Sequence, residues 1–242
     1  MDWAFFAAAF AAEVIGTIAG FGSSTVFLPL ALLFVDFHVA LVLVAVFHIF
    51  GNIGRFAFFR YGLDWKLLLK FGAPGVIATL AGSALVPHVQ QDALKLVLGL
   101  FLLLFSAFSL RFPGFHFKPT SAKTVLGGAV SGFLAGLIGT GGALRGAFLT
   151  GFNLRKEKYI ATSAAIALAV DFTRVPVYLS SGFLQEQYYW HVSALLAVAL
   201  AGAFAGKKLV DLVPQERFRK LVLAAIALAG LKFAYDGLAA FL

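Results

Sequence analysis

The feature that most constrains the fold of this chain is a series of eight apolar stretches separated by short polar segments. They run roughly over 3–35, 39–60, 66–87, 93–112, 124–152, 159–181, 189–210 and 218–241. A helix needs about 20 apolar residues to cross a bilayer, and six of the stretches have that length. Because 61% of the 242 residues are hydrophobic and only 12% are charged, little sequence remains for a water-soluble domain. The pattern predicts an all-α integral membrane protein, with residues 1–242 as a single transmembrane domain.

The first and fifth stretches are too long for one crossing, and both are interrupted by glycines. The interruptions read Gly20-Phe21-Gly22-Ser23-Ser24 and Gly139-Thr140-Gly141-Gly142. A shift of 119 residues aligns the two halves, placing Gly20 on Gly139, Gly22 on Gly141, Leu30 on Leu149, Asn52 on Asp171 and Arg55 on Arg174. Interrupted segments at corresponding positions are typical of transporters with internal repeats. We therefore expect two repeats, about 1–118 and 119–242, each a glycine-broken stretch followed by three plain helices.

The basic residues indicate how these stretches cross the membrane. If all eight crossed, seven loop Lys and Arg would lie on one side and nine on the other. If the first and fifth stretches are instead re-entrant hairpins, 14 lie on one side and only Lys95 and Lys232 on the other. Cytoplasmic loops carry the excess of Lys and Arg, which favours the hairpins. Three crossings in each half then make the repeats inverted, with both termini extracytoplasmic and the hairpins meeting near the midplane.

The glycine-broken hairpins also predict an anion site. Irregular backbone at membrane depth is tolerated where it lines a cavity, and a helix beginning near Ser23 or Gly142 would point free N–H groups and a positive dipole end into it. Arg145, in the first turn of the second such helix, is expected to clamp an oxyanion with paired donors. The alternative is an arginine that snorkels or forms a salt bridge. The predicted substrate-binding residues are Gly20, Gly22, Ser23, Ser24, Gly139, Thr140, Gly141, Gly142 and Arg145.

Two polar helix faces lie in equivalent positions of the repeats. His48, Asn52 and Arg55 share one face, and Asp171 and Arg174 share another. They are expected to line a polar cavity in which His48 or Asp171 carries a proton; the alternative is a pair that only pins helices together. Glu13 is either a proton carrier or an interface residue, and the sequence does not choose between these roles.

Several classes of function are not expected. The chain has no cysteine, which excludes disulfides and thiol chemistry. The remaining histidines have no clustered partners, and there is no convincing Ser–His arrangement, so we expect no metal, no cofactor, no catalytic residue and no enzyme activity. The net charge of +8 arises from residues between apolar runs and reports orientation, so no nucleic-acid partner is expected.

Two segments resemble a known family. Residues 16–30, GTIAGFGSSTVFLPL, and 132–143, GFLAGLIGTGGA, are similar to the paired motifs of the sulfite exporter TauE/SafE family of membrane transporters. Pro29 matches the family pattern, whereas Ala143 stands where a glycine is common and Phe148 where a proline is common. Arg145 is not a general feature of that family.

The resemblance implies a multi-pass protein of the bacterial plasma (inner) membrane. It would be a secondary transporter that moves a small anion such as sulfite or an organosulfonate by alternating access. A passive anion channel with the same central site is the alternative. Besides the anion and the lipid bilayer, a proton or sodium ion as coupling partner stays open, as do the direction of transport and the oligomeric state.

Overall fold

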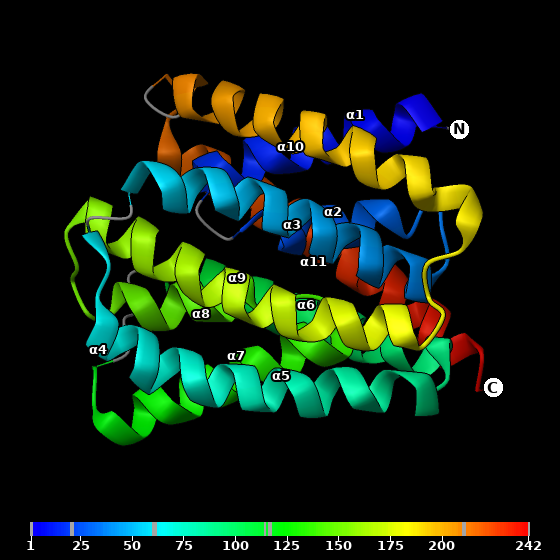
Figure 1. Cartoon of the computed structure of the whole chain (residues 1–242), viewed down its shortest axis with the longest axis horizontal. Helices are drawn as coiled ribbons and strands as arrows, with labels where there is room; N and C mark the ends of the chain where they lie inside the picture. Colours follow the sequence, from blue (N-terminus) through cyan, green and yellow to red (C-terminus); the bar gives the residue numbers. More distant parts are fainter. Residues whose placement is uncertain are drawn as a thin grey trace.

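The computed structural model describes residues 2–19, 22–59, 62–113, 115, 118–209 and 212–241, which form helices and no strand (Figure 1). The helices of the first half are α1 (Asp2–Ala19), α2 (Ser23–Ala31), α3 (Phe37–Phe59), α4 (Trp65–Leu67), α5 (Ala73–Leu85) and α6 (Gln91–Arg111). Those of the second half are α7 (Ser121–Ile138), α8 (Gly142–Thr150), α9 (Lys156–Ser180), α10 (Tyr189–Leu209) and α11 (Gln215–Ala239).

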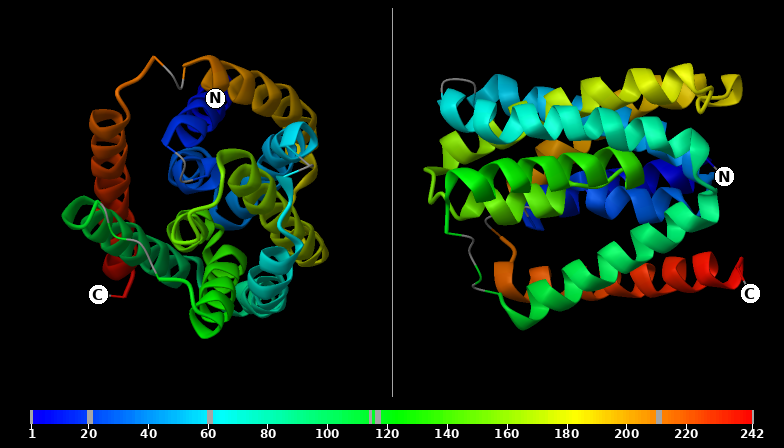
Figure 2. Two further views of the ribbon diagram at one scale, coloured as in Figure 1. Left: turned by 90° about the vertical axis from the view of Figure 1, so that its left-hand side faces the viewer. Right: turned by 90° about the horizontal axis from the view of Figure 1, so that it is seen from below.

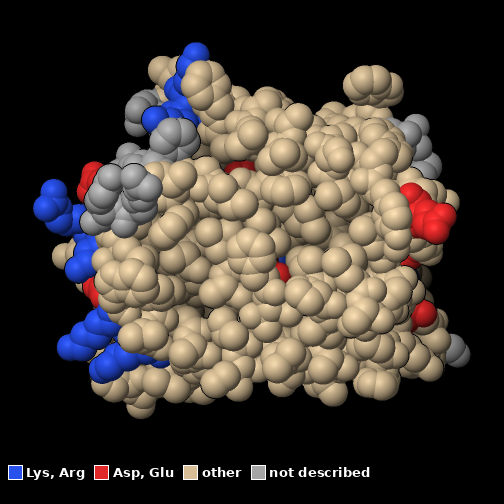
Figure 3. Space-filling model, viewed as in Figure 1, with Lys and Arg blue, Asp and Glu red and all other residues tan. Residues whose placement is uncertain are grey.

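The chain is a multi-pass membrane protein. Seven helices in its described part are long and apolar enough to cross a bilayer. In Figure 3 a broad belt with very few charged atoms at its surface separates one end rich in Lys and Arg from an opposite end that carries Asp and Glu. Such a belt matches the hydrocarbon core of a membrane, where charged side chains are costly.

Each glycine interruption lies between a long helix and a short one that returns beside it. The ring of Phe5, early in α1, lies 5.4 Å from the ring of Phe27 in α2 and 6.0 Å from that of Phe34 just beyond α2. In the second half, a Cβ atom at Gly127, early in α7, would lie 2.6 Å from the ring of Phe148, late in α8. The two arms have 18 and 9 residues in both hairpins. All of α7, Ser121–Ile138, counts as a candidate span, whereas the apolar part of α1, Trp3–Ile18, is too short for one.

The helices of the two halves start at corresponding positions. Asp2 and Ser121, Ser23 and Gly142, and Phe37 and Lys156 are each 119 residues apart and begin α1 and α7, α2 and α8, and α3 and α9. The neighbours correspond as well, because α1 and α3 pack on α10 as α7 and α9 pack on α5. Helix α3 packs on α9 and α6 on α11, and the α6–α11 pair lies along one side of the bundle (Figure 2).

Both termini lie at the same end of the bundle, on the right in Figure 1. The loops that connect α3 with α4, α6 with α7, α8 with α9 and α10 with α11 lie at the opposite end. This is the end at which the Lys and Arg side chains gather in Figure 3. Helix α1 begins at the end that holds the termini and α7 begins at the basic end, so the two helices run in opposite directions.

The expectation of a plain helix over 66–87 is wrong in one detail. Between α4 and α5 the chain makes a π-helical turn, Leu68–Gly72, and after α5 it ends in a 3-10 turn, Val86–His88. Pro74 is the second residue after the π turn. Since proline has no N–H to donate and its ring crowds the preceding turn, the regular hydrogen-bond ladder is interrupted here.

Asp64 caps α4 and joins the two halves at the basic end. Its side chain accepts a hydrogen bond from the Leu67 N–H at 2.9 Å and pairs with Lys158 Nζ at 3.1 Å. Its own N–H donates to Thr162 Oγ1 at 2.9 Å. The bond from Leu67, aided by Lys158, holds the pKa of Asp64 below its usual range, because both favour the charged carboxylate.

Small residues allow α5 and α7 to pack backbone against backbone. A Cβ atom at Gly128 would lie 2.1 Å from the Phe71 carbonyl oxygen, and one at Gly132 would lie 2.1 Å from that of Gly75. The Thr79 hydroxyl donates across this contact to the Gly132 carbonyl at 2.9 Å. Small residues commonly let membrane helices approach this closely.

We expect Gly132→Ala to destabilise the protein by about 1–3 kcal/mol, because the added methyl meets backbone that cannot rotate away. Gly54→Ala in α3 is the matched control, since a Cβ atom there meets nothing within 4 Å. Removing a helical glycine should leave the control unchanged or more stable by about 0.5–1 kcal/mol. The measurement is thermal unfolding in one detergent, and equal stability of the two variants would contradict the close contact.

Candidate anion site

The turns of the two hairpins meet at the centre of the molecule. A Cβ atom at Gly22 would lie 3.8 Å from Gly142 Cα and 3.7 Å from His48 Nε2. Close by, the hydroxyls of Thr25 and Thr140 lie 3.0 Å apart and link α2 to the turn before α8. The second arms of the hairpins therefore begin side by side, next to a face of α3.

Two helix N-termini are thus directed at one place. The first N–H groups of α2 and of α8 have no partner inside their helices, as in any helix, and carry the positive ends of the helix dipoles. Ser23 and Ser24 in the first turn of α2 are buried, and the Ser23 hydroxyl has no hydrogen-bond partner in the described part of the chain. Donors without partners at two helix N-termini are suited to an anion.

The glycines of the turns have identifiable roles. Gly22 has φ +84° and Gly139 has φ +74°, a region that side chains other than glycine rarely adopt. A Cβ atom at Gly141 would lie 2.0 Å from the Ser131 carbonyl oxygen, so this position needs glycine for close approach. Gly20 lies outside the described residues.

A buried network connects three helices beside the turns. Asp171 Oδ2 lies 2.8 Å from His48 Nδ1, and Asp171 Oδ1 accepts from Arg174 Nε at 2.9 Å and pairs with its Nη2 at 2.8 Å. Arg174 Nη1 donates to the Ala135 carbonyl at 2.8 Å, while the Tyr178 hydroxyl donates to that of Gly136 at 2.5 Å. These contacts tie α9 to α3 and to the end of α7.

The partners of Asp171 determine the protonation pattern of His48. A carboxylate paired with an arginine only accepts hydrogen bonds, so the neutral imidazole carries its proton on Nδ1. His48 Nε2 is then a bare acceptor. It is buried, has no hydrogen-bond partner among the described residues and lies beside Gly22. Protonation would turn this atom into a donor facing the hairpin turns.

Arg145 brings a positive charge to the same region. Its side chain is only 7% exposed, and its Nε lies 3.3 Å from Ser163 Oγ. Within the described part of the chain, no carboxylate lies within ion-pair distance of its guanidinium. Arg145 is therefore buried, unlike a snorkelling arginine, and it is not neutralised by a salt bridge with a described residue.

Arg55 and Asn52 contact different partners from those of Arg174. Arg55 forms an ion pair with Glu13 of α1 and donates to Thr17 Oγ1 at 3.2 Å, which gives Glu13 the role of an interface residue. Asn52 donates to the His48 carbonyl at 2.8 Å and accepts from Arg55 at 3.4 Å. Among the described contacts, it is His48 that links this face of α3 to Asp171.

Several of these partners were not predicted from the sequence. Tyr178 lies four residues after Arg174, and Thr17 lies four residues after Glu13, so helical spacing along one face was a usable signal. Thr25 and Ser163 carried no such signal, because their partners lie on other helices. Among the described residues, no group of three or more His, Asp, Glu or Cys side chains is arranged to hold a metal ion.

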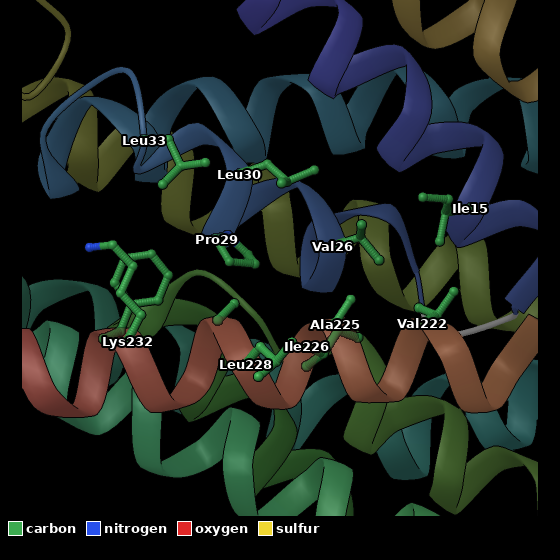
Figure 4. A pocket seen from close by; sticks show the side chains of 12 residues that line it. Ile15, Val26, Pro29, Leu30, Leu33, Val222, Ala225, Ile226, Leu228 and Lys232 are labelled. Carbon is green, nitrogen blue, oxygen red and sulfur yellow. The ribbon is translucent and has the colours of Figure 1, made fainter.

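A separate hollow of about 380 Å³ lies between α1, α2 and α11 (Figure 4). Its lining is apolar, with Pro29 and Leu30 on one wall and Val222 and Ile226 on the other, and it includes a single charged residue, Lys232. Lys232 is paired with Asp236, and the rest of the lining is apolar, so the candidate site for an anion is the junction of the hairpins.

The model of a family described as "Sulfite exporter TauE/SafE" matches residues 5–233. The chain belongs to this family. Comparison with curated proteins and comparison with solved structures each gave no match. The sulfite exporter TauE/SafE family consists of membrane transporters, and both hairpins and the polar network lie within the matched range.

We expect Asp171→Asn to destabilise this TauE/SafE protein by about 3–5 kcal/mol, because Arg174 would lose its counter-charge in a buried place. Asp92→Asn is the matched control, since Asp92 pairs with Lys95 at 2.8 Å with its side chain 43% exposed. An exposed pair contributes about 0–1 kcal/mol. Unfolding in detergent measures both, and a small effect at Asp171 would show that the network does not hold the helices together.

Proposed function

We propose that this protein is a secondary transporter that moves a small oxyanion, sulfite or an organosulfonate, across the bacterial plasma membrane. The observation that carries the proposal is Arg145, a buried arginine with no described carboxylate partner beside two converging helix N-termini. A buried charge is costly unless something compensates it, and an oxyanion would do so with paired hydrogen bonds.

The charges around the junction match an anion of low charge. Asp171 is balanced by Arg174, and Glu13 by Arg55. Arg145 leaves one net positive charge while His48 is neutral, and protonation of His48 would add a second. The free donors around it are the N–H groups at the starts of α2 and α8, the Ser23 hydroxyl and the guanidinium Nη atoms. This arrangement suits a tetrahedral sulfur oxyanion, whose oxygens accept from several directions.

The closed state of the site supports alternating access. The side chains of Ser23, His48, Arg145 and Asp171 are all 7% exposed or less, so the structure closes the site from both ends. A conducting channel needs a continuous path, whereas a transporter passes through closed states. Saturable flux of sulfite into liposomes that is driven uphill by another gradient would support a transporter, and passive, non-saturating flux would favour the anion channel.

We infer further that the halves are inverted repeats, about 1–118 and 119–242, related by a two-fold axis in the membrane plane. Corresponding helix starts 119 residues apart and corresponding neighbours support this arrangement. The contacts of the two equivalent arginines support it as well. Arg174 donates to Ala135 of α7, and the position 119 residues before Ala135 is Gly16 of α1. Arg55 contacts Glu13 and Thr17, which lie on either side of Gly16. Rocking of such repeats around a fixed site is a common basis of alternating access.

The basic end is assigned to the cytoplasm, with both termini outside. The chain has no cysteine, so single cysteines can be labelled without background. In intact cells, an impermeant thiol reagent should label Trp3→Cys and Asp36→Cys and leave Lys123→Cys and Lys220→Cys unlabelled until the cells are opened. Labelling of Trp3→Cys and Asp36→Cys from opposite faces would contradict the first hairpin.

Arg145→Ala should weaken anion binding by about 1.5–3 kcal/mol, because it removes charge-assisted hydrogen bonds and leaves only the helix N-termini. That is roughly a tenfold to hundredfold loss of affinity. Arg145→Lys should recover only part of it, since lysine lacks the planar fork. Sulfite affinity and initial flux are measured at matched protein levels.

The matched control is Arg111→Ala, which removes an exposed arginine at the end of α6 and should bind sulfite as the parent does. Near-parental affinity and flux of Arg145→Ala would remove Arg145 from the site. Equal losses in Arg145→Ala and Arg111→Ala would indicate a general effect of surface charge.

A further inference from the structure

Among the described residues of the junction, His48 is a buried titratable side chain with one ring nitrogen, Nε2, that lies beside the hairpin turns without a partner. Its Nε2 lies near Gly22, which is itself beside Gly142, and the side chain is only 3% exposed. Its other nitrogen is fixed by Asp171 at 2.8 Å. An anion seated between the two helix N-termini would therefore lie against Nε2.

Neutral His48 does not suit such a neighbour. With the proton on Nδ1, the lone pair of Nε2 would face the oxygens of a sulfonate or of sulfite, which also only accept hydrogen bonds. Protonated His48 instead donates from Nε2 to the anion while it still donates from Nδ1 to Asp171. Binding of the anion therefore raises the affinity of His48 for a proton, and protonation of His48 raises the affinity for the anion by the same factor.

From this geometry we infer that His48 takes up a proton together with the anion, so that the two cross the membrane together. The inference rests on the proposed transport function and names its coupling ion. The proton comes from water on the side where the site opens, stays on Nε2 while the site is closed, and returns to water on the other side with the anion. No bond to the anion forms or breaks.

The other charged groups around His48 are less suited to carry the proton. Asp171, Arg145 and Arg174 are the charged groups that act on it, from α9 and α8. Asp171 is held by Arg174, and Glu13 of α1 is held by Arg55. Helix α2 contributes no ionisable side chain, Asp92 and Lys95 of α6 pair with each other, and Lys207 and Lys208 lie in the last turn of α10.

The remaining histidine of the helices packed on α3 serves as a control. His191 of α10 is also buried, at 5% exposed, but its ring lies 5.4 Å from that of Phe6 and 4.2 Å from that of Trp190, among aromatic side chains. Its replacement removes a buried imidazole without touching the junction.

The test uses the full-length protein in liposomes that contain a fluorescent pH indicator, with ethanesulfonate as the probe, because this anion keeps one charge over the pH range used. Uptake should bring in about one proton per anion. The rate of uptake should rise about tenfold for each unit by which the pH falls, over the pH range in which His48 is unprotonated in most molecules. Because the pair carries no net charge, an imposed membrane potential should not change the rate.

His48→Gln should lose the proton movement and the pH dependence of whatever ethanesulfonate flux it retains, whereas His191→Gln should keep one proton per anion. Ethanesulfonate uptake by the parent protein without protons would overturn the inference and leave the proposed transport function standing. No uptake of ethanesulfonate or of sulfite at any pH would overturn both. The parent stoichiometry decides whether a proton crosses with the anion even if His48→Gln does not reach the membrane, and the comparison of His48→Gln with His191→Gln decides whether His48 carries it.

Discussion

The centre of this protein depends on the carboxylate of Asp171. One of its oxygens contacts His48 of α3 and the other contacts Arg174, which in turn holds the end of α7 through the Ala135 carbonyl. In a bilayer these polar groups have no water to replace a lost partner, so they must satisfy each other. The network therefore fixes α3 and α9 beside the hairpin turns and also sets which nitrogen of His48 is free.

The hairpin turns provide the second condition for a site. A helix that begins inside the membrane leaves its first N–H groups without intrahelical partners there, whereas a helix that spans the whole membrane leaves them at the surface. Glycine at positions 22 and 139 permits the left-handed turns, and glycine at 141 permits contact with the backbone of Ser131. The same residues that break the helices thus create two positive ends side by side, and Arg145 adds a full charge to them. Family membership and local chemistry agree on an anion.

Close packing explains how so apolar a chain holds polar groups in place. Helix α7 contacts α5 through glycine backbones, and the Thr79 hydroxyl bridges the two helices. In hydrocarbon the hydrophobic effect does not drive helices together, so such contacts carry the packing. The candidate site lies between tightly packed elements on one side and the α1–α2 hairpin on the other, where the hollow between α1, α2 and α11 marks a looser contact.

The amino-acid sequence by itself determined the membrane class, the helical content, the positions of both breaks and the 119-residue offset between the halves, because each follows from local hydrophobicity, glycine or charge along the chain. It also placed His48, Asp171 and Arg145 in candidate positions. Only the tertiary structure decided which of them meet: His48 with Asp171, Glu13 with Arg55, and Thr25 with Thr140. Spacing within one helix is set by its 3.6-residue turn. Contacts between helices depend on how each is rotated and how closely it packs, and residues 42 to 123 positions apart on different helices carry no local signal of that.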